Sequence, residues 1–200
     1  MIATPSRERI HELIAAGDAG TAASEAITAL GPHVLRYLQS ILHDEGDLAD
    51  AFSVFAEAVW KGLPSFRWES SLTTWAYRLA HHAALRVRDQ PWRRRLRRLE
   101  TSEASLLADS VRTKTFIRAE RQRQSLEKLI AVLPVEDQSL LALRIGEGLE
   151  WSEISAIMTR KGTPVDANTI AKRFSRLKER LSRMAREQGL VEGPDPTGSV

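Results

Sequence analysis

The stretch WSEISAIMTRKGTPVDANTIAKRFSRLKERL, residues 151–181, contains the clearest pair of helices in the sequence. Its first part has an apolar helical face formed by Trp151, Ile154, Ile157 and Met158. Its last part has a second such face, formed by Ile170, Phe174, Leu177 and Leu181. The segment between them, TRKGTPVDA, is longer than an ordinary helix-turn-helix turn. The pattern fits either a DNA-binding helix-turn-helix with an unusual turn or two helices that simply pack together.

The second helix of this pair carries polar and basic side chains opposite its apolar face. These residues are Thr169, Lys172, Arg173, Ser175, Arg176, Lys178 and Arg180. Such a helix fits the major groove of DNA, with its N-terminal residues near the bases and its basic residues on phosphates. A helix pair alone is a weak signal, and the rest of the chain has to support it.

Composition limits what the chain can be. Its 200 residues allow one domain or two small ones, and 42% of them are apolar. No run of about 18 apolar residues occurs, so no membrane span is expected. The N-terminal segment carries charges where a signal peptide needs an apolar stretch, so a soluble, cytoplasmic protein is expected. The absence of cysteine excludes disulfides, thiolate zinc sites and cysteine nucleophiles.

Charge is unevenly distributed, although the formal net charge is only +3. Residues 86–100 and residues 171–186 are strongly basic, whereas residues 43–50 are acidic. Two separate basic clusters favour two contacts with a polyanion such as nucleic acid. The alternative interpretation is two solvated helix faces.

The rest of the sequence is also helical in pattern, without a persuasive alternating strand. Helices are expected at residues 6–16, 19–42 with a possible bend at Gly31-Pro32, 48–63, 72–88, 116–133, 136–146, 151–158 and from 168 onward. Their N-caps are expected at Asp47, Ser70 or Ser71, Ser152, and Asp166 or Asn168. The predicted fold class is all-α, with two helical domains at 1–98 and 116–187, a flexible linker at 99–115 and a disordered tail at 188–200.

Motifs of catalysis are absent. The sequence has no Walker loop, no dinucleotide-binding glycine motif and no HExxH. His81 and His82 are adjacent on a helix, so their rings point about 100° apart and do not easily share a metal. We therefore expect no enzyme activity, no cofactor and no metal site.

Three stretches together resemble a sigma factor of the sigma-70 family, of the extracytoplasmic-function type. The first is GDLADAFSVFAEAVWKGLPSF, 46–66; the second is FRWESSLTTWAYRLAHHAAL, 66–85, with an F…S…TW-x-x-R-x-A pattern. The third is LPVEDQSLLALRIGEGLEWSEISAIM followed by NTIAKRFSRLKERL. The resemblance runs from about residue 8 to residue 186.

The resemblance implies a non-catalytic subunit that directs promoter-specific transcription initiation. Its region 2-like first domain would bind the β′ clamp helices of core RNA polymerase and the −10 promoter element. Its region 4-like second domain would bind the β flap and the −35 element. Such factors are commonly controlled by an anti-sigma factor, which is a further expected partner.

Roles at the polymerase surface follow from the same resemblance. Asp47, Asp50 and Glu57 are expected to meet the polymerase. Trp60, on the same helix, is expected to be a core residue. The family often has Gln-Glu where this chain has Ser53 and Val54, which leaves contacts at those two positions open.

DNA-contacting residues are implied in the same way. The −10 element would be opened and held by Phe66, Trp68, Thr74, Arg78, His81, His82, Arg88, Trp92, Arg93 and Arg94. Trp75, in the same stretch, is expected to be core. The −35 element would be contacted by Thr169, Lys172, Arg173 and Arg176, with Arg160 and Lys161 of the long turn as added phosphate contacts. A longer turn is tolerated because loop lengthening costs little entropy.

Two other functions remain open from the sequence. One is a helical adaptor that has a sigma-like fold without recognising promoters, for which the only support is the pair Ser53 and Val54. The other is a dimeric helix-turn-helix repressor, although a repressor has no use for a −10 opening module.

Overall fold

The computed structural model describes residues 7–89, 126–159 and 165–190, and these residues are helical with no strand among them. The helices are α1 (Arg7–Ala15), α2 (Ala19–Ile41), α3 (Glu45–Gly62), α4 (Leu72–Arg88), α8 (Val135–Leu141), α9 (Trp151–Met158) and α10 (Ala167–Glu187). A 3-10 turn (Leu63–Ser65) follows α3, residues 126–131 are helical, and a π-helical turn (Ala142–Gly146) extends α8. The all-α prediction is confirmed.

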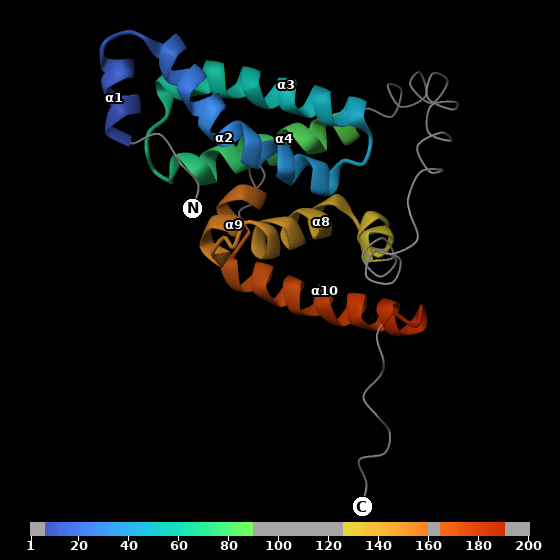
Figure 1. Ribbon diagram of the computed structural model, residues 1–200. Helices are drawn as coiled ribbons and strands as arrows, with labels where there is room; N and C mark the ends of the chain where they lie inside the picture. The colour runs from blue at the N-terminus through green and yellow to red at the C-terminus, as the bar shows by residue number, and fades with distance from the viewer. Residues whose placement is uncertain (1–6, 90–125, 160–164, 191–200) are drawn as a thin grey trace, which may run out of the picture.

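Helices α1 to α4 form an N-terminal unit in which α2, α3 and α4 pack on one another (Figure 1). Buried apolar residues hold it together, including Leu38 of α2 and Phe55 of α3. The inner side of α4 is built from the small residues Ala76, Ala80, Ala83 and Ala84. Because these side chains are short, neighbouring helices can approach α4 closely. α4 packs against α2 and α3 within the unit and against α9 of the C-terminal part.

Two of the expected N-caps differ from the observed ones. α3 begins at Glu45, and its cap is Asp44, which accepts the Asp47 N–H at 2.8 Å; Asp47 is not the cap. Glu150, rather than Ser152, precedes α9, and its N–H donates to the Glu153 carboxylate at 3.0 Å. In both cases the helix starts before the residue that was expected to cap it.

The other caps agree with the sequence. Ser71 caps α4 by accepting the Thr74 N–H at 3.0 Å. Asp166, one of the two expected residues, caps α10 by accepting the Thr169 N–H at 3.2 Å. α2 continues through Pro32, where the sequence suggests a bend. Within the described residues, no helix combines the length and apolar character needed to cross a membrane.

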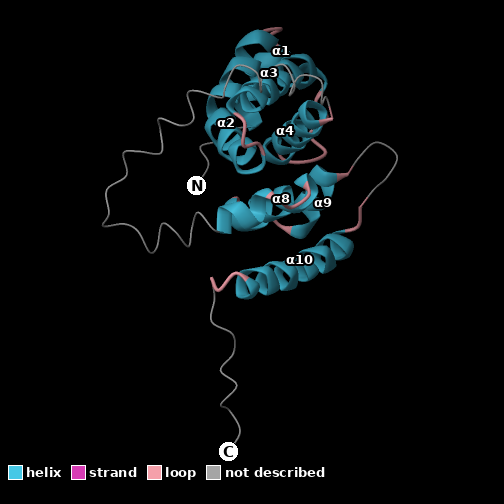
Figure 2. Cartoon of the chain, turned by 90° about the vertical axis from the view of Figure 1, so that its right-hand side faces the viewer, coloured by secondary structure: helices cyan, strands magenta, loops and turns pink. Residues whose placement is uncertain are grey.

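The C-terminal unit, residues 126–159 and 165–190, packs directly on the N-terminal unit. α9 contacts α4 and α8 contacts α2, so that buried apolar residues of both units form one continuous cluster. Figures 1 and 2 show α8 and α9 lying between the α1–α4 bundle and α10. The expected linker at 99–115 and tail at 188–200 lie wholly or mainly outside the described residues.

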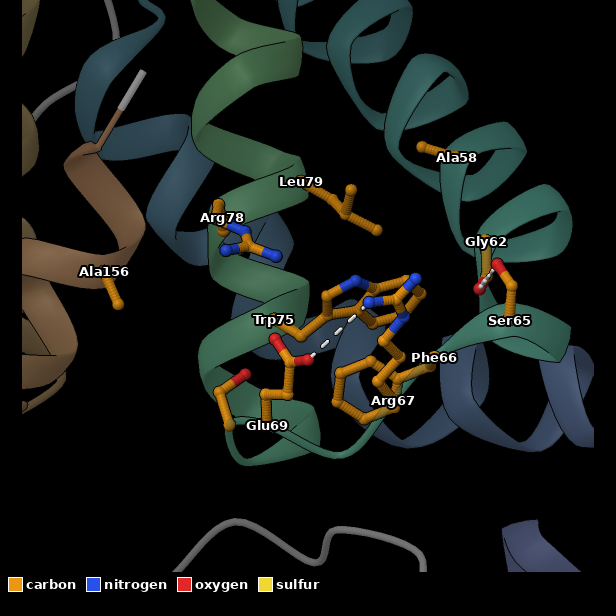
Figure 3. A pocket seen from close by; sticks show the side chains of 11 residues that line it. Ala58, Gly62, Ser65, Phe66, Arg67, Glu69, Trp75, Arg78, Leu79 and Ala156 are labelled. Carbon is orange, nitrogen blue, oxygen red and sulfur yellow. Dashed lines mark hydrogen bonds and ion pairs between the residues drawn. The ribbon is translucent and has the colours of Figure 1, made fainter. Parts of the chain in front are cut away.

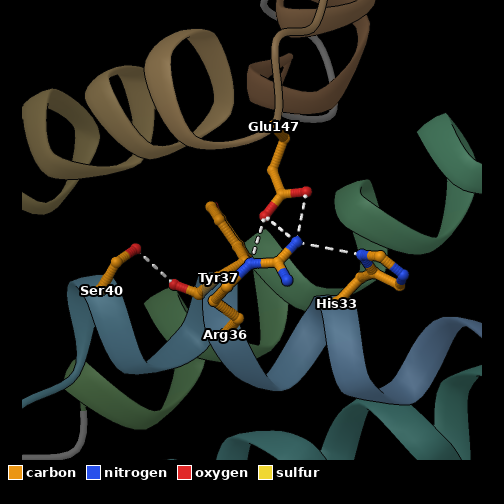
Figure 4. A network of polar contacts seen from close by, with 5 residues as sticks. All are labelled: His33, Arg36, Tyr37, Ser40 and Glu147. Carbon is orange, nitrogen blue, oxygen red and sulfur yellow. Dashed lines mark hydrogen bonds and ion pairs between the residues drawn. The ribbon is translucent and has the colours of Figure 1, made fainter. Parts of the chain in front are cut away.

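The π-helical turn after α8 shapes the boundary between the units. The Glu147 N–H donates to the carbonyl of Ala142 at 3.0 Å and closes the turn. Gly148 follows in the left-handed region with φ +68°, which a residue with a side chain rarely adopts. This turn directs the Glu147 side chain toward α2, where it meets Arg36 (Figure 4).

Candidate nucleic-acid interface

An aromatic cluster lies in the connection between α3 and α4. The ring of Phe66 packs against Trp68 and against Trp75, with centroids 4.9 Å apart in both pairs. Trp68 also stacks on His11 at 5.1 Å, with the ring planes 19° apart. The backbone of Trp68 is in the left-handed region, with φ +59°, an uncommon conformation for a bulky residue. Such backbone conformations gather at binding sites and persist where packing fixes them.

A pocket of about 530 Å³ opens beside this cluster (Figure 3). Its walls come from the ends of α3 and α4, from the connection between them, and from Ala156 of α9. Phe66 and Trp75 supply aromatic surface, and Arg67 and Arg78 supply positive charge. Arg67 lies 4.0 Å from the Glu69 carboxylate and both side chains are exposed, so this ion pair is weak. The pocket therefore combines ring faces with cations.

Trp75 forms part of the pocket and is nearly buried, as the sequence predicts. A Cβ atom built on Gly62 would lie 3.0 Å from the Trp75 ring, which is closer than side chains normally approach. Gly62 therefore allows the indole to lie against the end of α3.

The residues expected to contact the −10 element fall into separate groups. Phe66 and Trp68 are half-buried in the aromatic cluster, Arg78 is exposed at the pocket, and Arg88 is half-buried at the end of α4. Three others, Trp92, Arg93 and Arg94, lie outside the described residues.

Two of the expected −10 residues, His81 and Thr74, do not face solvent. His81 is 1% exposed, and its Nδ1 lies 3.1 Å from the Tyr37 hydroxyl. Thr74 is buried, and its hydroxyl donates to Glu153 of α9 at 3.1 Å. His82 is half-buried. His81 is thus a core residue and Thr74 a contact between the units, because α2, α3 and α9 all pack on α4. Their burial does not fit a direct DNA contact in this structure, and the contact stays a prediction.

The outer face of α3 differs from expectation at two residues. Asp47 is 5% exposed, so its expected role at a polymerase surface does not fit its burial. Trp60 is 54% exposed, whereas the sequence suggests a core residue. Its ring lies beside Gly20 of α2, where an added Cβ atom would be 3.5 Å from the indole.

The exposed residues of this face follow helical spacing. Asp50, Ser53, Glu57 and Trp60 recur every three or four residues, and Ser53, Glu57 and Trp60 are exposed while Asp50 is half-buried. Glu57 pairs with Lys61, and this hydrogen bond and charge lower the pKa of the Glu57 carboxyl. The face presents an aromatic ring beside a carboxylate that stays charged at neutral pH.

Helix α10 has the two faces that its sequence predicts. Ile170, Phe174 and Leu177 are buried, and the Phe174 ring packs against Trp151 of α9 with centroids 5.3 Å apart. The expected −35 residues Thr169, Lys172, Arg173 and Arg176 are all exposed. α8 and α9 lie between α10 and the N-terminal unit, so α10 is the outermost helix (Figure 1).

Arg173, one of these residues, also has a partner within the protein that local sequence patterns do not indicate. Arg173 Nε donates to Asp137 Oδ1 of α8 at 2.7 Å. The Arg173 side chain is 42% exposed and that of Asp137 12% exposed. The ion pair ties α10 to α8 while it leaves much of the guanidinium group open.

The long turn of the helix-turn-helix is closed at both ends. Ser155 donates to the Val165 carbonyl, and the Val165 N–H donates to the Thr159 hydroxyl at 3.3 Å. Arg160 and Lys161 lie outside the described residues. A turn of this length therefore still places α10 against α9.

Polar contacts between the two units are the feature that local sequence patterns do not reveal. Arg36 of α2 donates to both carboxylate oxygens of Glu147, with Nη2 at 3.0 and 3.1 Å (Figure 4). Within the N-terminal unit, the Tyr77 ring of α4 stands edge-on to the Tyr37 ring of α2, with centroids 5.5 Å apart. Burial, and then the nearby Glu147, raise the pKa of Tyr77. Arg36 and Glu147 are 111 residues apart in the chain, so no short-range signal connects them.

Comparison with known families locates one match. Residues 26–101 match the family model of sigma-70 region 2. The matched span runs from α2 through α3 and α4. It therefore includes the exposed face of α3 and the pocket walls that α3, α4 and their connection form. Comparison with curated proteins finds no match. Sigma-70 family proteins are transcription initiation factors and not enzymes. The similarity to sigma-70 region 2 thus covers residues 26–101, which include α3, α4 and most of α2.

Proposed function

We propose that this chain is a sigma factor of the extracytoplasmic-function type. It binds core RNA polymerase and recognises a −10 element with a region 2-like domain, residues 1–98, and a −35 element with a region 4-like domain, residues 116–187. The proposal is supported by two features that occur in the same segment of the chain. Residues 26–101 match sigma-70 region 2, and the same residues build an aromatic and cationic pocket.

The pocket supports a contact with an unpaired base of the −10 strand. Bases stack on aromatic rings with little dependence on sequence, and cationic side chains hold the backbone beside them. Phe66 and Trp75 provide ring surface, and Arg67 and Arg78 provide the charges. Trp68, next to this pocket, stabilises Phe66 in its position. Trp92, Arg93 and Arg94 are proposed to extend this surface.

The exposed face of α10 supports a contact with duplex DNA at −35. Thr169, Lys172 and Arg176 lie on its solvent side and are free of the apolar contacts with α9. Arg173 is held at Asp137 and is proposed to bind a phosphate with its remaining exposed surface. Arg160 and Lys161 are proposed to add phosphate contacts from the turn.

The outer face of α3 supports a contact with the polymerase. Trp60 and Glu57 form an exposed aromatic and acidic patch, with Asp50 at its edge. Exposed tryptophans are frequent anchors of protein interfaces. We propose that this patch meets the β′ clamp helices, and that the C-terminal unit meets the β flap. An anti-sigma factor that covers the same surfaces is the proposed regulator.

Val54 differs from the residue that the sigma-70 family often has at this position, but the difference does not weaken the proposed contact with the polymerase. Val54 packs against the core and so does not belong to the exposed face, whereas Ser53 does. The support for an adaptor that does not recognise promoters is therefore reduced to Ser53 alone.

Run-off transcription with core polymerase tests the proposal. Adding the purified chain to core polymerase and fragments of the source genome is expected to give discrete, promoter-dependent transcripts. Copurification with β′ separates the proposal from a repressor, which does not need the polymerase. If no genomic fragment supports a transcript although the chain binds β′, the adaptor becomes the better assignment.

A further inference from the structure

A row of four aromatic rings runs from the pocket to α1. The Trp75 ring packs against Phe66 and the Phe66 ring against Trp68, with centroids 4.9 Å apart in both pairs. The Trp68 indole then stacks on the His11 imidazole of α1 at 5.1 Å, with the ring planes 19° apart. Phe66 and Trp75 line the pocket, whereas Trp68 and His11 lie beyond it. The proposed contact with one unpaired base therefore uses only part of this row.

The backbone of Trp68 indicates that this residue does more than fill space. Its φ of +59° lies in the left-handed region, which a bulky residue adopts at a cost in free energy. A glycine adopts the same backbone without this cost. The tryptophan nevertheless leaves part of its side chain in solvent, since it is only half-buried. A strained tryptophan that the core does not fully enclose is typical of a ligand-binding position.

α1 holds His11 at a fixed place on the bundle. Ile10 is fully buried and Leu13 nearly so, and both belong to the same core cluster as the rest of the N-terminal unit. Arg9 donates to Glu25 of α2 at 3.1 Å. His11 itself is exposed and contacts the Trp68 indole. Because the two ring planes are nearly parallel, the imidazole extends the flat surface of the indole toward solvent.

Positive charge and spacing suit a strand that crosses from the pocket to these two rings. Arg67 lies between Phe66 and Trp68 in the chain and is exposed at the pocket (Figure 3). Its pairing with Glu69 is weak, so a phosphate that joins two bases can recruit the guanidinium group. The 4.9 Å between the Phe66 and Trp68 centroids is comparable with the rise of about 3.4 Å per nucleotide in one strand. Consecutive bases can therefore reach the two rings.

We propose that Trp68 and His11 form a second stacking position for an unpaired base, next to the base held in the pocket. The strand-binding surface then extends from α4 across the α3–α4 connection to α1 and holds two consecutive nucleotides. This inference rests on the proposed function, because it adds a position to the same surface. His11 lies outside residues 26–101, so the family match assigns no part of this position to α1.

The second position is expected to add affinity with little sequence preference. Every base has a flat π-face, so stacking on an aromatic ring depends little on which base is present. One further stacked base raises affinity by about tenfold. Loss of the Trp68 ring removes this gain, and loss of the His11 ring reduces it, because the imidazole enlarges and supports the stacking surface.

Strands with a defined number of bases measure this position in the full chain. The probes are fluorescein-labelled single strands of equal length, built of abasic residues with either one thymine or two consecutive thymines at the centre. Fluorescence anisotropy gives the affinity of the chain for each probe. Both probes carry the same phosphates, so the ratio of the two affinities reports the second base. Without a second position this ratio is about two, on statistical grounds alone.

Three variants and one control are compared with the wild-type chain. Trp68→Gly removes the indole and suits the left-handed backbone, His11→Ala removes the imidazole, and His11→Phe keeps a ring at residue 11. His43→Ala is the matched control, because His43 is an exposed histidine in the connection between α2 and α3.

The expected result is a change in the ratio of the two affinities. We expect a ratio of about ten for the wild-type chain, for His11→Phe and for His43→Ala. Trp68→Gly lowers the ratio to about two, and His11→Ala gives a value between these limits. The ratio is the decisive quantity, since a misplaced Phe66 weakens the binding of both strands alike.

Each contrary result overturns a stated part of the inference. A wild-type ratio no greater than about two overturns the second position. An unchanged ratio in Trp68→Gly, with both strands weakened equally, shows that Trp68 only positions Phe66. An unchanged ratio in His11→Ala removes α1 from the surface, and this variant decides the point even if Trp68→Gly fails to fold. The proposed function fails separately, when the wild-type chain neither copurifies with β′ nor supports transcription, whatever the strands show.

Discussion

The hydroxyl of Thr74 donates a hydrogen bond to Glu153 at 3.1 Å, and 79 residues separate these two residues in the chain. Thr74 is in the first turn of α4, beside the aromatic pocket, and Glu153 is in the first turn of α9. Glu153 also accepts the Glu150 N–H that begins its own helix. One carboxylate thus starts α9 and attaches it to α4.

Trp60→Ala should impair binding to core polymerase without loss of fold. Trp60 is 54% exposed, so its removal costs little packing in the free chain. Truncation of a tryptophan at the centre of an interface commonly costs about 2 kcal/mol or more of binding free energy. Copurification with β′ and thermal denaturation measure the two effects, with Ser24→Ala on α2 as the surface control. Unchanged affinity for the polymerase would place its binding surface elsewhere.

Arg176→Ala should weaken binding to −35 duplex DNA with little effect on stability. Arg176 is exposed on α10, and a base contact at such a position is worth about 1–3 kcal/mol. Anisotropy with cognate and scrambled duplexes measures it. Equal losses on both duplexes would assign Arg176 to a phosphate.

Arg173→Ala should differ from Arg176→Ala by lowering the melting temperature as well. Arg173 pairs with the largely buried Asp137, which loses its charged partner in the variant. We expect about 1–3 kcal/mol lower free energy of unfolding, measured by urea denaturation. Asp137→Asn serves as the second variant, since it removes the charge on α8 and leaves Arg173 in place. Normal stability of both variants would contradict a structural role for the pair.

His81→Ala should destabilise the fold rather than act on DNA alone. His81 is buried and hydrogen-bonded to Tyr37, so the variant leaves a cavity and removes the partner of a buried hydroxyl. We expect about 2–4 kcal/mol lower free energy of unfolding. Tyr37→Phe is the control that removes the hydroxyl but keeps the ring. A fully stable His81→Ala that fails only in promoter binding would restore the sequence-based assignment.

Phe66→Ala should reduce promoter opening more than duplex binding. Its ring forms part of the pocket, and stacking of one base contributes about 1–3 kcal/mol. Permanganate reactivity of unpaired thymines measures opening, and a gel shift with duplex DNA measures binding. Equal losses in both assays would make Phe66 a folding residue of the α3–α4 connection.

The sequence predicts what local chemistry controls. The limits of α4 agree with expectation at Leu72 and Arg88, because Ser71 supplies a cap and small apolar residues mark one buried side. The two faces of α10 also follow from spacing alone. Burial of His81 and Thr74 does not, because it depends on which helices pack around α4. A motif places a residue on a helix, but neighbouring helices decide whether the side chain reaches solvent.

Trp60 and Glu147 show the same limit of sequence-based prediction, with opposite outcomes. Trp60 is apolar and yet 54% exposed, although its ring lies beside Gly20 of α2. Glu147 is charged and its side chain is nearly buried, since Arg36 reaches it from the other unit. Composition predicts neither outcome. Both depend on contacts between segments that are distant in the chain.

The outward position of α10 has a consequence for the order of events at a promoter. Its exposed basic residues remain available to duplex DNA while α9 packs on α4 and lines one side of the pocket. Under the proposed roles, α10 can therefore meet double-stranded DNA without any separation of the two units.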